Sequence, residues 1–373
     1  MGITKTNGEK LETMAKKKDD SSIESLLSQY STLSDSSFQR DKVRVNPACI
    51  NTLFGGGITP GSMYGFWGGA GSGKSTIALQ IVRSYCAQGR KCAIIDTEHA
   101  LNDNQLQSFG LYDYLKSGLL FVFNNAGDFS DVEVLIEGIK DAGGFELVVL
   151  DSETETAVAS DGLKVADVRP GLHARQSGYI LQKMKTLFFR SNIASIIIFH
   201  ARANIQMTGI PAHGAPATKQ AGGYAATHIP DLILKVSGGQ KFRQDPSDKQ
   251  SAVVGRFVTL ECEKNKFAIP FQQITERLFF GLGISEKYST IDRALELGVI
   301  VRRGPYYLLP NGDQVCGLSE LYKISNDVVR TLKEQLPAME LASTGMSASS
   351  MDSGDVLDSD DTGEVEDAEF ADD

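Results

Sequence analysis

The sequence predicts an α/β fold in which a mainly parallel sheet is flanked by helices. From Met63 onward, short apolar runs alternate with segments of helical periodicity, and this alternation is typical of βαβ units. Most of the runs are apolar throughout, which indicates strands that are buried on both faces. We therefore expect a sheet with helices on both sides.

The apolar runs and the periodic segments place the expected elements along the chain. The strands expected in the parallel sheet are 63–67, 92–96, 119–123, 147–150, 194–199 and 232–236. The helices expected between them are 74–88, 131–141 and 172–190. Two later runs, 256–261 and 272–278, predict further strands at an antiparallel edge.

The N-terminal residues differ from this central part, which we place at 46–282. Residues 1–20 carry five lysines and few apolar groups, so we expect a disordered tail there. In 21–45, the apolar residues at 23, 26, 27 and 30 lie on one helical face, which predicts a short helix followed by a linker. Such a helix must dock on its own body or on a neighbouring copy to bury that face.

After residue 282 the pattern changes to short elements. Residues 283–340 predict a small α+β C-terminal domain, with helices near 291–297 and 327–335 and a hairpin near 306–315. Residues 341–373 are rich in Ser, Gly, Asp and Glu, so we expect them to be disordered.

Charge is distributed unevenly along the 373 residues. The net charge is −10, but residues 352–373 hold eleven carboxylates and no Lys or Arg. The rest of the chain has nearly equal numbers of acidic and basic residues, so a nucleic-acid partner is not excluded. By composition alone, this acidic tail can serve solubility.

Two classes of protein are disfavoured by the composition. No apolar run is long enough to cross a membrane, and residues 1–20 lack a signal layout, so we expect a cytoplasmic protein without a membrane partner. The five cysteines are scattered and contain no CxxC pair, which argues against a zinc site or a disulfide framework. We expect them to be reduced packing residues.

Residues 68–75, GGAGSGKS, match the pattern G-x-x-x-x-G-K-[ST] between a strand and a helix. In that context the backbone N–H groups cradle phosphate oxygens, the lysine reaches the β and γ phosphates, and the serine hydroxyl coordinates Mg²⁺. The alternative is a flexible Gly/Ser loop. The predicted nucleotide-binding residues are Gly68, Gly71, Ser72, Gly73, Lys74, Ser75, Thr76 and Asp151, with Ser75 and Asp151 on the metal side.

Two carboxylates are expected at the same edge of the sheet. Asp151 ends the run 147–150 and suits a Mg²⁺ ligand through water, while Glu98 follows the run 92–96 and can activate the attacking water. The alternative for Glu98 is a solvated or capping residue. Phosphoryl transfer also needs more positive charge than Lys74 supplies, and no arginine lies close in sequence to the loop.

Several segments together resemble the RecA family of homologous-recombination proteins, which includes phage-encoded members. The segments are Gly68–Ser75, 95–101 (IDTEHAL), 149–152 (VLDS), 171–175 (GLHAR), Gly222-Gly223 and 264–271 (KNKFAIPF). Their order and spacing match over roughly residues 45 to 335. The resemblance implies a RecA-like P-loop ATPase core with ATP and Mg²⁺ as cofactors.

The resemblance also implies roles for individual residues. Glu98 would be the catalytic carboxylate and Asp151 the acid beside Mg²⁺. Lys264 and Lys266 would reach across a subunit boundary to the neighbour's γ-phosphate, whereas the plain alternative is two solvated charges at a strand end. His200 stands where the family often has a γ-phosphate-sensing Gln, although a structural histidine is the alternative. Asn102 and Gln105 replace the family's adenine-contacting Asp and Tyr.

Two further segments coincide with the family's DNA-binding loops, about 160–171 and 203–223. The residues expected to bind DNA are Arg169, Pro170, Arg175, Arg202, Ile205, Lys219, Gly222 and Gly223. Arginine and lysine suit a salt-sensitive grip on the phosphate backbone, and glycines let backbone N–H groups approach it. Without the resemblance these segments could be ordinary surface connections.

The resemblance therefore implies an ATP-dependent recombinase that forms a homo-oligomeric filament on single-stranded DNA and exchanges strands with homologous duplex DNA. It implies that the helix in 21–45 is an oligomerisation helix. It also implies that the acidic tail competes with DNA for basic surface, as a salt-sensitive screen, the alternative being a solubility tail. Single-strand-binding and mediator proteins are further candidate partners. The alternatives are a ring helicase or DNA translocase on the same ATPase core, which the lysine pair disfavours, and a nucleotide-gated assembly protein that does not act on DNA.

Overall fold

The computed structural model describes residues 40–156, 171–203, 218–220, 223–244 and 250–343. It divides the chain into two units, Met1–Arg293 and Ala294–Asp373. The predicted helix near 21–30, most of both predicted DNA-binding loops and the acidic tail 352–373 lie outside the described residues. In the described part, no helix is long and apolar enough to span a bilayer.

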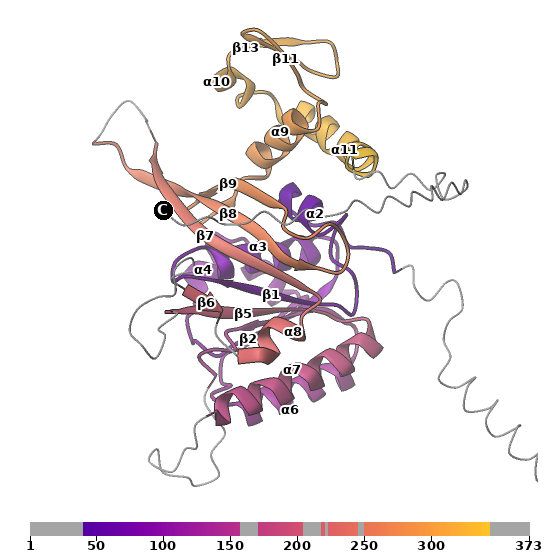
Figure 1. Cartoon of the computed structure of the whole chain (residues 1–373), viewed down its shortest axis with the longest axis vertical. Coiled ribbons are helices and arrows are strands. Elements are labelled where there is room, and N and C mark those ends of the chain that lie inside the picture. The colour runs from indigo at the N-terminus through magenta and orange to yellow at the C-terminus, as the bar shows by residue number, and fades with distance from the viewer. Residues whose placement is uncertain (1–39, 157–170, 204–217, 221–222, 245–249, 344–373) are drawn as a thin grey trace, which may run out of the picture. The chain divides into compact units, whose positions relative to one another are not determined.

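The first unit contains most of the regular structure (Figure 1). Its helices are α2 (Ala48–Leu53), α3 (Lys74–Ala87), α4 (Asp103–Ser108), α5 (Tyr112–Lys116), α6 (Phe129–Ala142), α7 (Leu172–Ser191) and α8 (Gly223–His228). Its strands are β1 (Met63–Gly68), β2 (Lys91–Asp96), β3 (Leu120–Phe123), β4 (Phe145–Asp151), β5 (Ala194–Ala203), β6 (Thr218–Gln220), β7 (Leu232–Arg243), β8 (Val253–Asn265), β9 (Gln273–Phe279) and β10 (Gly283–Ile284). Helix α9 (Glu286–Glu296) contains the division between the units.

One large sheet organises this unit, with the order β10-β9-β8-β7-β1-β5-β4-β2-β3 and with β6 paired to β5. Strands β7, β1, β5, β4, β2 and β3 run parallel, while β8, β9 and β10 continue the sheet in antiparallel fashion. The predicted parallel sheet with an antiparallel edge is therefore confirmed. Strand β1 lies at its centre, and ligands of such sheets bind at the carboxyl ends of the central strands.

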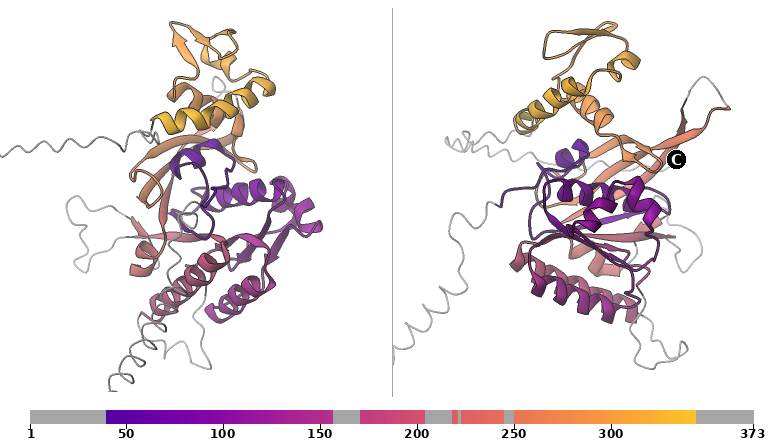
Figure 2. Two further views of the ribbon diagram at one scale, coloured as in Figure 1. Left: turned by 90° about the vertical axis from the view of Figure 1, so that its right-hand side faces the viewer. Right: turned by 180° about the vertical axis from the view of Figure 1, so that it is seen from behind.

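Alternate side chains of the parallel strands face two separate cores. Ile94 of β2 packs in a buried cluster with Ile77 and Ile81 of α3, whereas the next residue, Ile95, packs with residues of α6 and α7 such as Ile136. Figures 1 and 2 show α3 on one face of the sheet and the α6–α7 pair on the other. Strands buried on both faces need apolar residues at every position, which is why their sequences are continuous apolar runs.

Strands β7 and β8 are longer than the apolar pattern predicts, 232–236 and 256–261. Beyond Val236, β7 continues through exposed residues to Arg243, and β8 pairs with it over the same length with shifts in register. The hairpin thus extends past the core, where polar residues are tolerated and no apolar signal is present. It projects from the sheet in both figures.

The second unit contains the sheet β11 (Val301–Arg303), β12 (Tyr306–Leu308) and β13 (Gln314–Cys316), with helices α10 (Leu318–Leu321) and α11 (Asn326–Ser343). Strands β12 and β13 form the predicted hairpin. Leu309, Leu321 and Leu332 are among its buried residues.

Three expectations need correction. Helix α11 continues to Ser343, three residues into the segment expected to be disordered, and α9 begins at Glu286 rather than near 291. Of the five free cysteines, four are buried as expected but Cys316 is exposed on β13. A three-stranded sheet is too small to bury both of its faces. Cys316 is therefore exposed, whereas the other four cysteines lie in buried positions of the first unit.

Candidate nucleotide-binding site

The phosphate loop, Gly68–Ser75, joins the end of β1 to the start of α3. Gly73 precedes the helix with φ at +107°, a conformation that strongly favours glycine. A Cβ atom at Gly68 would collide with the carbonyl oxygen of Val236, and one at Gly73 with the side chain of Leu278. The sequence therefore folds this way because only glycine fits where β7 and β9 press against the loop.

Lys74 begins α3 and is almost fully buried. Its Nζ atom donates to the carbonyl oxygens of Gly68 and Gly69, each at 3.0 Å. Burial lowers the pKa of Lys74, while the negative charges of Asp151 and Glu98 oppose that shift. The loop thus bends around the ammonium group of Lys74, which donates to neutral carbonyl oxygens in this structure. A phosphate oxygen in their place would accept a stronger, charge-assisted hydrogen bond from Lys74.

Asp151 ends β4 beside this loop. Burial raises its pKa to about 6, and the nearby hydroxyl of Ser75 partly opposes the shift. Among the described residues, no hydrogen-bond partner reaches Asp151 Oδ1 or the buried hydroxyl of Ser72. Buried polar atoms are normally satisfied, so these two fit a site that is completed by a ligand. The hydroxyl of Ser75 and the carboxylate of Asp151 are oxygen ligands that suit Mg²⁺, directly or through water.

Glu98 and His200 meet above the end of β4. Glu98 follows β2 and His200 belongs to β5, with β4 between those strands in the sheet. Their Oε1 and Nε2 atoms are 2.6 Å apart. Burial acts to raise the pKa of Glu98, but the hydroxyl of Ser152, the imidazole of His200 and the charge of Lys74 together hold it below its ordinary value. Glu98 is therefore a carboxylate at neutral pH, which a general base requires.

The turn that carries Glu98 is held by its neighbours. Asp96, almost fully buried, accepts from the backbone N–H of Leu101 at 2.9 Å, and Thr97 donates to the carbonyl of Ser152 at 2.7 Å. Asn102 accepts from the backbone N–H of Gln105 and caps α4. In this structure Asn102 thus serves the start of a helix, which is a local role that its sequence position did not reveal.

Arg256 is a candidate that the sequence did not indicate. It lies on β8, yet its Nη1 atom donates to the carbonyl oxygen of Gly71 in the phosphate loop at 2.9 Å. Its guanidinium fills the space next to Gly238, where any Cβ atom would collide with it. This contact spans 185 residues and depends on the extended hairpin, so no local motif could have found it.

The lysine pair lies at the opposite end of the strands. Lys264 is paired with Ile233, near the start of β7, whereas the phosphate loop follows the end of the parallel strand β1. The structure therefore brings Lys74, Glu98, Asp151 and His200 together but keeps Lys264 and Lys266 away from them. Within one chain, the pair does not complete the site.

Specific contacts hold both lysines at that end. Lys266 forms an ion pair with Asp231 at 2.9 Å, and Lys185 binds the same carboxylate oxygen at 2.8 Å. Lys264 donates to the carbonyl oxygens of Thr227 and His228 at the end of α8, and burial followed by the charges of Lys266 and Lys185 lowers its pKa. The result is a concentration of positive charge that Asp231 only partly offsets.

The expected DNA-binding residues are only partly described. Strands β5 and β6 form an antiparallel pair in which Arg202 lies opposite Lys219, so the second predicted loop leaves and re-enters the fold at one place. Arg175 is exposed in the first turn of α7, and Gly223 begins α8 with φ at +67°. Arg169, Pro170, Ile205 and Gly222 lie outside the described residues.

The chain is similar to several known proteins. A family model described as the RecA N-terminal domain matches residues 20–285. The RecA protein of Helicobacter acinonychis is 28% identical over 295 residues, which are 76% of this chain and 80% of that protein. The RecA protein of Helicobacter pylori strain G27 is 30% identical over 252 residues, or 67% of this chain and 69% of that protein. A crystal structure of the RadB recombinase aligns with a TM-score of 0.45 at 22% identity, covering 63% of this chain and 94% of that one. Because the family model spans well over half of the sequence, the chain belongs to the RecA family.

Proposed function

We propose that this protein is an ATP-dependent recombinase, which assembles on single-stranded DNA and pairs it with homologous duplex DNA. Membership of the RecA family supports recombination, ATP binding and DNA binding in general. One observation carries the proposal further. The phosphate-loop groups gather at one end of the sheet, while Lys264 and Lys266 lie at the other.

In the proposed ATPase reaction, each residue at the phosphate-loop end has one task. Backbone N–H groups of the loop and the Lys74 ammonium bind the β and γ phosphates. Mg²⁺, held through Ser75 and Asp151, would offset the charge that develops on the phosphates. Glu98 accepts a proton from the attacking water, and its low pKa and its contact with His200 keep it ionised and oriented.

The lysine pair supplies the positive charge that one chain lacks at its own site. If copies stack head to tail, Lys264 and Lys266 of one copy face the γ-phosphate held by the next. ATP then stabilises the junction, because it binds both copies, and hydrolysis removes the group that they share. Assembly and turnover are thereby coupled without any covalent chemistry on DNA.

Two contacts support a link between this junction and the proposed DNA-binding loop. His200, beside Glu98, is three residues from the end of β5, where the second loop begins. Lys264 binds the last carbonyls of α8, the helix that follows the same loop. A change in phosphate contacts at Glu98 would therefore reach the start of the second loop through His200. A change at Lys264 would reach the end of the same loop through α8.

Strand exchange tests the proposal directly. The protein is incubated with ATP, Mg²⁺, circular single-stranded DNA and homologous linear duplex DNA. Joint molecules that need ATP support a recombinase. Unwinding of a forked duplex without joint molecules would instead indicate a ring helicase or translocase. Absence of both, together with hydrolysis that DNA does not stimulate, would indicate an assembly protein that does not act on DNA.

A further inference from the structure

We infer that three threonine hydroxyls couple the first predicted DNA-binding loop to the candidate site. The residues are Thr97, Thr154 and Thr156. They are positioning residues, because they act through Glu98 and His200 rather than on a phosphate. The inference rests on the proposed function, since it assigns to these hydroxyls the means by which DNA at that loop changes the rate of ATP hydrolysis.

The segment 152–156 connects the end of β4 to the first predicted loop, which is expected to begin near residue 160. In the sheet, β4 lies between β2, which leads to Glu98, and β5, which carries His200. Ser152, Glu153 and Thr156 are almost fully buried. The path from the sheet to the loop therefore runs between the two strands whose side chains meet at the candidate site.

Hydroxyl groups attach this segment to the turn that carries Glu98. Thr97 and Thr156 both donate to the carbonyl oxygen of Ser152, at 2.7 and 2.9 Å. The Oγ1 atoms of Thr97 and Thr156 are 3.4 Å apart. The backbone N–H of Thr97 also donates to the carbonyl oxygen of Asp151 at 2.9 Å. Because Thr97 directly precedes Glu98, a displacement of Thr156 would move the proposed catalytic carboxylate.

Two further contacts attach the same segment to β5. The backbone N–H of His200 donates to Oγ1 of Thr154 at 3.0 Å. The backbone N–H of Glu153 donates to the carbonyl oxygen of Ile198, also at 3.0 Å. His200 is thus held at its main chain by Thr154 and at its ring by Glu98, which is 2.6 Å away. A displacement of the segment would therefore reach Glu98 from the β5 side as well.

Hydroxyls at these positions favour a fixed geometry over simple packing. Thr97 and Thr156 are 6% and 1% exposed, and valine, which has nearly the same shape, would bury more apolar surface there. A buried hydroxyl costs free energy unless it is hydrogen-bonded, and a hydrogen bond fixes direction as well as distance. The three hydroxyls therefore specify how the segment lies between the Glu98 turn and β5, which is what a mechanical coupling requires.

DNA at the first loop would act through this contiguous set of contacts. A shift of the residues that follow Thr156 would be passed to Thr97 and so to Glu98. Thr154 would move the main chain of His200 with the segment, so that the imidazole stays in contact with the carboxylate. Without the hydroxyls, DNA would still bind and Glu98 would still be ionised, but the two events would be independent.

Substitutions that keep the shape of the side chain test the inference in the full chain. Thr154→Val and Thr156→Val each remove one hydroxyl, whereas Thr154→Ser and Thr156→Ser retain it. The ratio of kcat with single-stranded DNA to kcat without it should fall at least about fivefold in each valine variant, as expected for loss of one buried hydrogen bond. The serine variants should recover most of this ratio. The kcat without DNA should change less than about twofold.

A binding measurement gives a second readout that does not depend on turnover. A non-hydrolysable ATP analogue should raise the affinity of the parent for single-stranded DNA, because coupling between two binding sites is reciprocal. In the valine variants this increase should be at least about fivefold smaller. The affinity for DNA without nucleotide should stay close to that of the parent, and melting temperatures identify any variant that has lost its fold.

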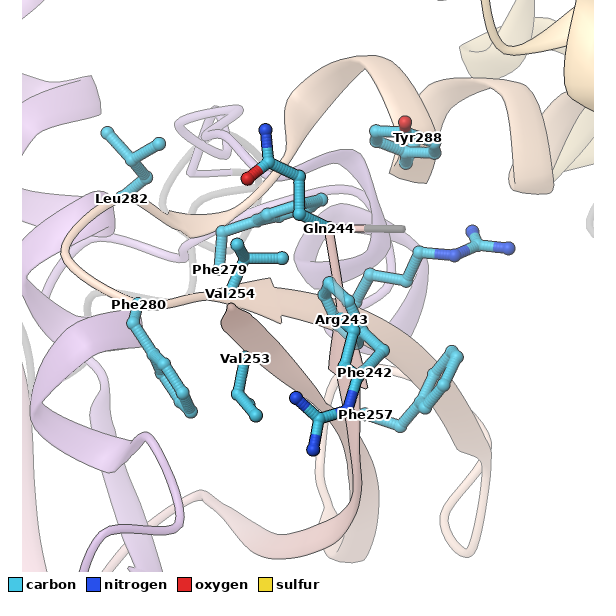
Figure 3. A pocket seen from close by; sticks show the side chains of 11 residues that line it. Phe242, Arg243, Gln244, Val253, Val254, Phe257, Phe279, Phe280, Leu282 and Tyr288 are labelled. Atoms are coloured by element: carbon cyan, nitrogen blue, oxygen red, sulfur yellow. The ribbon is translucent and has the colours of Figure 1, made fainter. Parts of the chain in front are cut away.

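Thr259→Val is the matched control. Thr259 of β8 and Thr275 of β9 share a hydrogen bond of 3.1 Å, so this variant also loses a threonine hydroxyl contact. The pair lies two residues along these strands from Phe257 and Arg277, which line a groove of about 750 Å³ (Figure 3). It belongs to the antiparallel part of the sheet, away from the segment 152–156, so both readouts should equal those of the parent.

The outcomes separate this inference from the proposed function. If DNA stimulates the parent and the valine variants equally, the inference is wrong and the recombinase proposal stands. The same holds if the serine variants lose as much stimulation as the valine variants, or if kcat falls equally with and without DNA, since the hydroxyls would then serve only the fold of the site. If DNA does not stimulate the parent at all, the proposed function is wrong and the inference fails with it.

Discussion

His200 and Glu98 belong to strands that are not neighbours, yet His200 Nε2 lies 2.6 Å from Glu98 Oε1 above the end of β4. The contact joins the proposed catalytic carboxylate to the strand that leads into the second proposed DNA-binding loop. In the proposed mechanism, His200 would therefore hold the general base in place and also respond to DNA.

Glu98→Gln should abolish turnover but preserve nucleotide binding. The amide cannot accept a proton from the attacking water, so kcat should fall by about 10²–10⁴, while ATP-dependent assembly on DNA persists. The measurement is phosphate release beside sedimentation with single-stranded DNA. Glu155→Gln removes a nearby exposed carboxylate and should have no effect. Undiminished hydrolysis by Glu98→Gln would exclude Glu98 as the base.

His200→Ala should uncouple DNA from hydrolysis. Without the imidazole, the stimulation of ATPase activity by single-stranded DNA should decrease strongly, whereas binding of ATP in the absence of DNA should change little. His200→Gln retains a hydrogen-bond donor and should recover part of the stimulation. If both variants are stimulated as well as the parent, His200 is a structural residue only. The ratio of kcat with and without DNA is the relevant measurement.

Binding of Mg²⁺–nucleotide should weaken as pH falls through 6. Burial raises the pKa of Asp151 from 3.8 to about 6 in the chain without ligand, and a protonated carboxyl is a poor metal ligand. The Kd should rise by up to about tenfold per pH unit below this value. Asp151→Asn should bind more weakly at pH 8 and lose this pH dependence. A titration at constant ionic strength, with a fluorescent ATP analogue, measures both.

The same shift has a consequence for stability. The folded chain favours the neutral form of Asp151, so the free energy of unfolding should fall as pH rises from 3.8 to about 6. Asp151→Asn should remove this contribution. A parent and a variant with identical pH profiles of urea denaturation would show that the carboxyl is not perturbed by its site.

Arg256→Ala should weaken ATP binding by loosening the phosphate loop. The lost bond to the Gly71 carbonyl is charge-assisted, so the Kd for ATP should rise by about tenfold or more. Because Arg256 acts through the loop, kcat at saturating ATP should change less than KM. Arg256→Lys should restore part of the affinity, and Arg303→Ala, an exposed arginine on β11, serves as the control. Equal affinities for all four proteins would leave Arg256 without a role.

The interior of the parallel sheet could be predicted because its inner strands are largely buried on both faces and most of their residues form continuous apolar runs. The outer parts of β7 and β8 could not, since Gly238 to Lys241 are exposed and leave no apolar period. Helix α8 is six residues long and follows a segment without pattern, so it too gave no signal. Sequence patterns report burial, and these segments extend beyond the buried core.

The residues of the candidate site also include some that could be predicted from the sequence and some that could not. Lys74 could be predicted from the pattern in residues 68–75, and Asp151 and Glu98 because each lies at or just after a strand end at a known edge. Arg256 could not, because its approach to Gly71 depends on how the hairpin folds over the loop. The pairing of Glu98 with His200 was also not predictable, since it depends on the order of strands in the sheet rather than on their order in the chain.

A mixing experiment tests most directly whether ATP is bound between two copies. Lys74→Ala should have an inactive phosphate loop, and the double variant Lys264→Ala, Lys266→Ala an inactive partner surface, so each alone should lack DNA-stimulated hydrolysis. In an equal mixture, about a quarter of random head-to-tail junctions combine an intact loop with intact lysines, and activity should return to about that fraction of the parent. No recovery in the mixture, or full activity of the double variant by itself, would contradict a shared site.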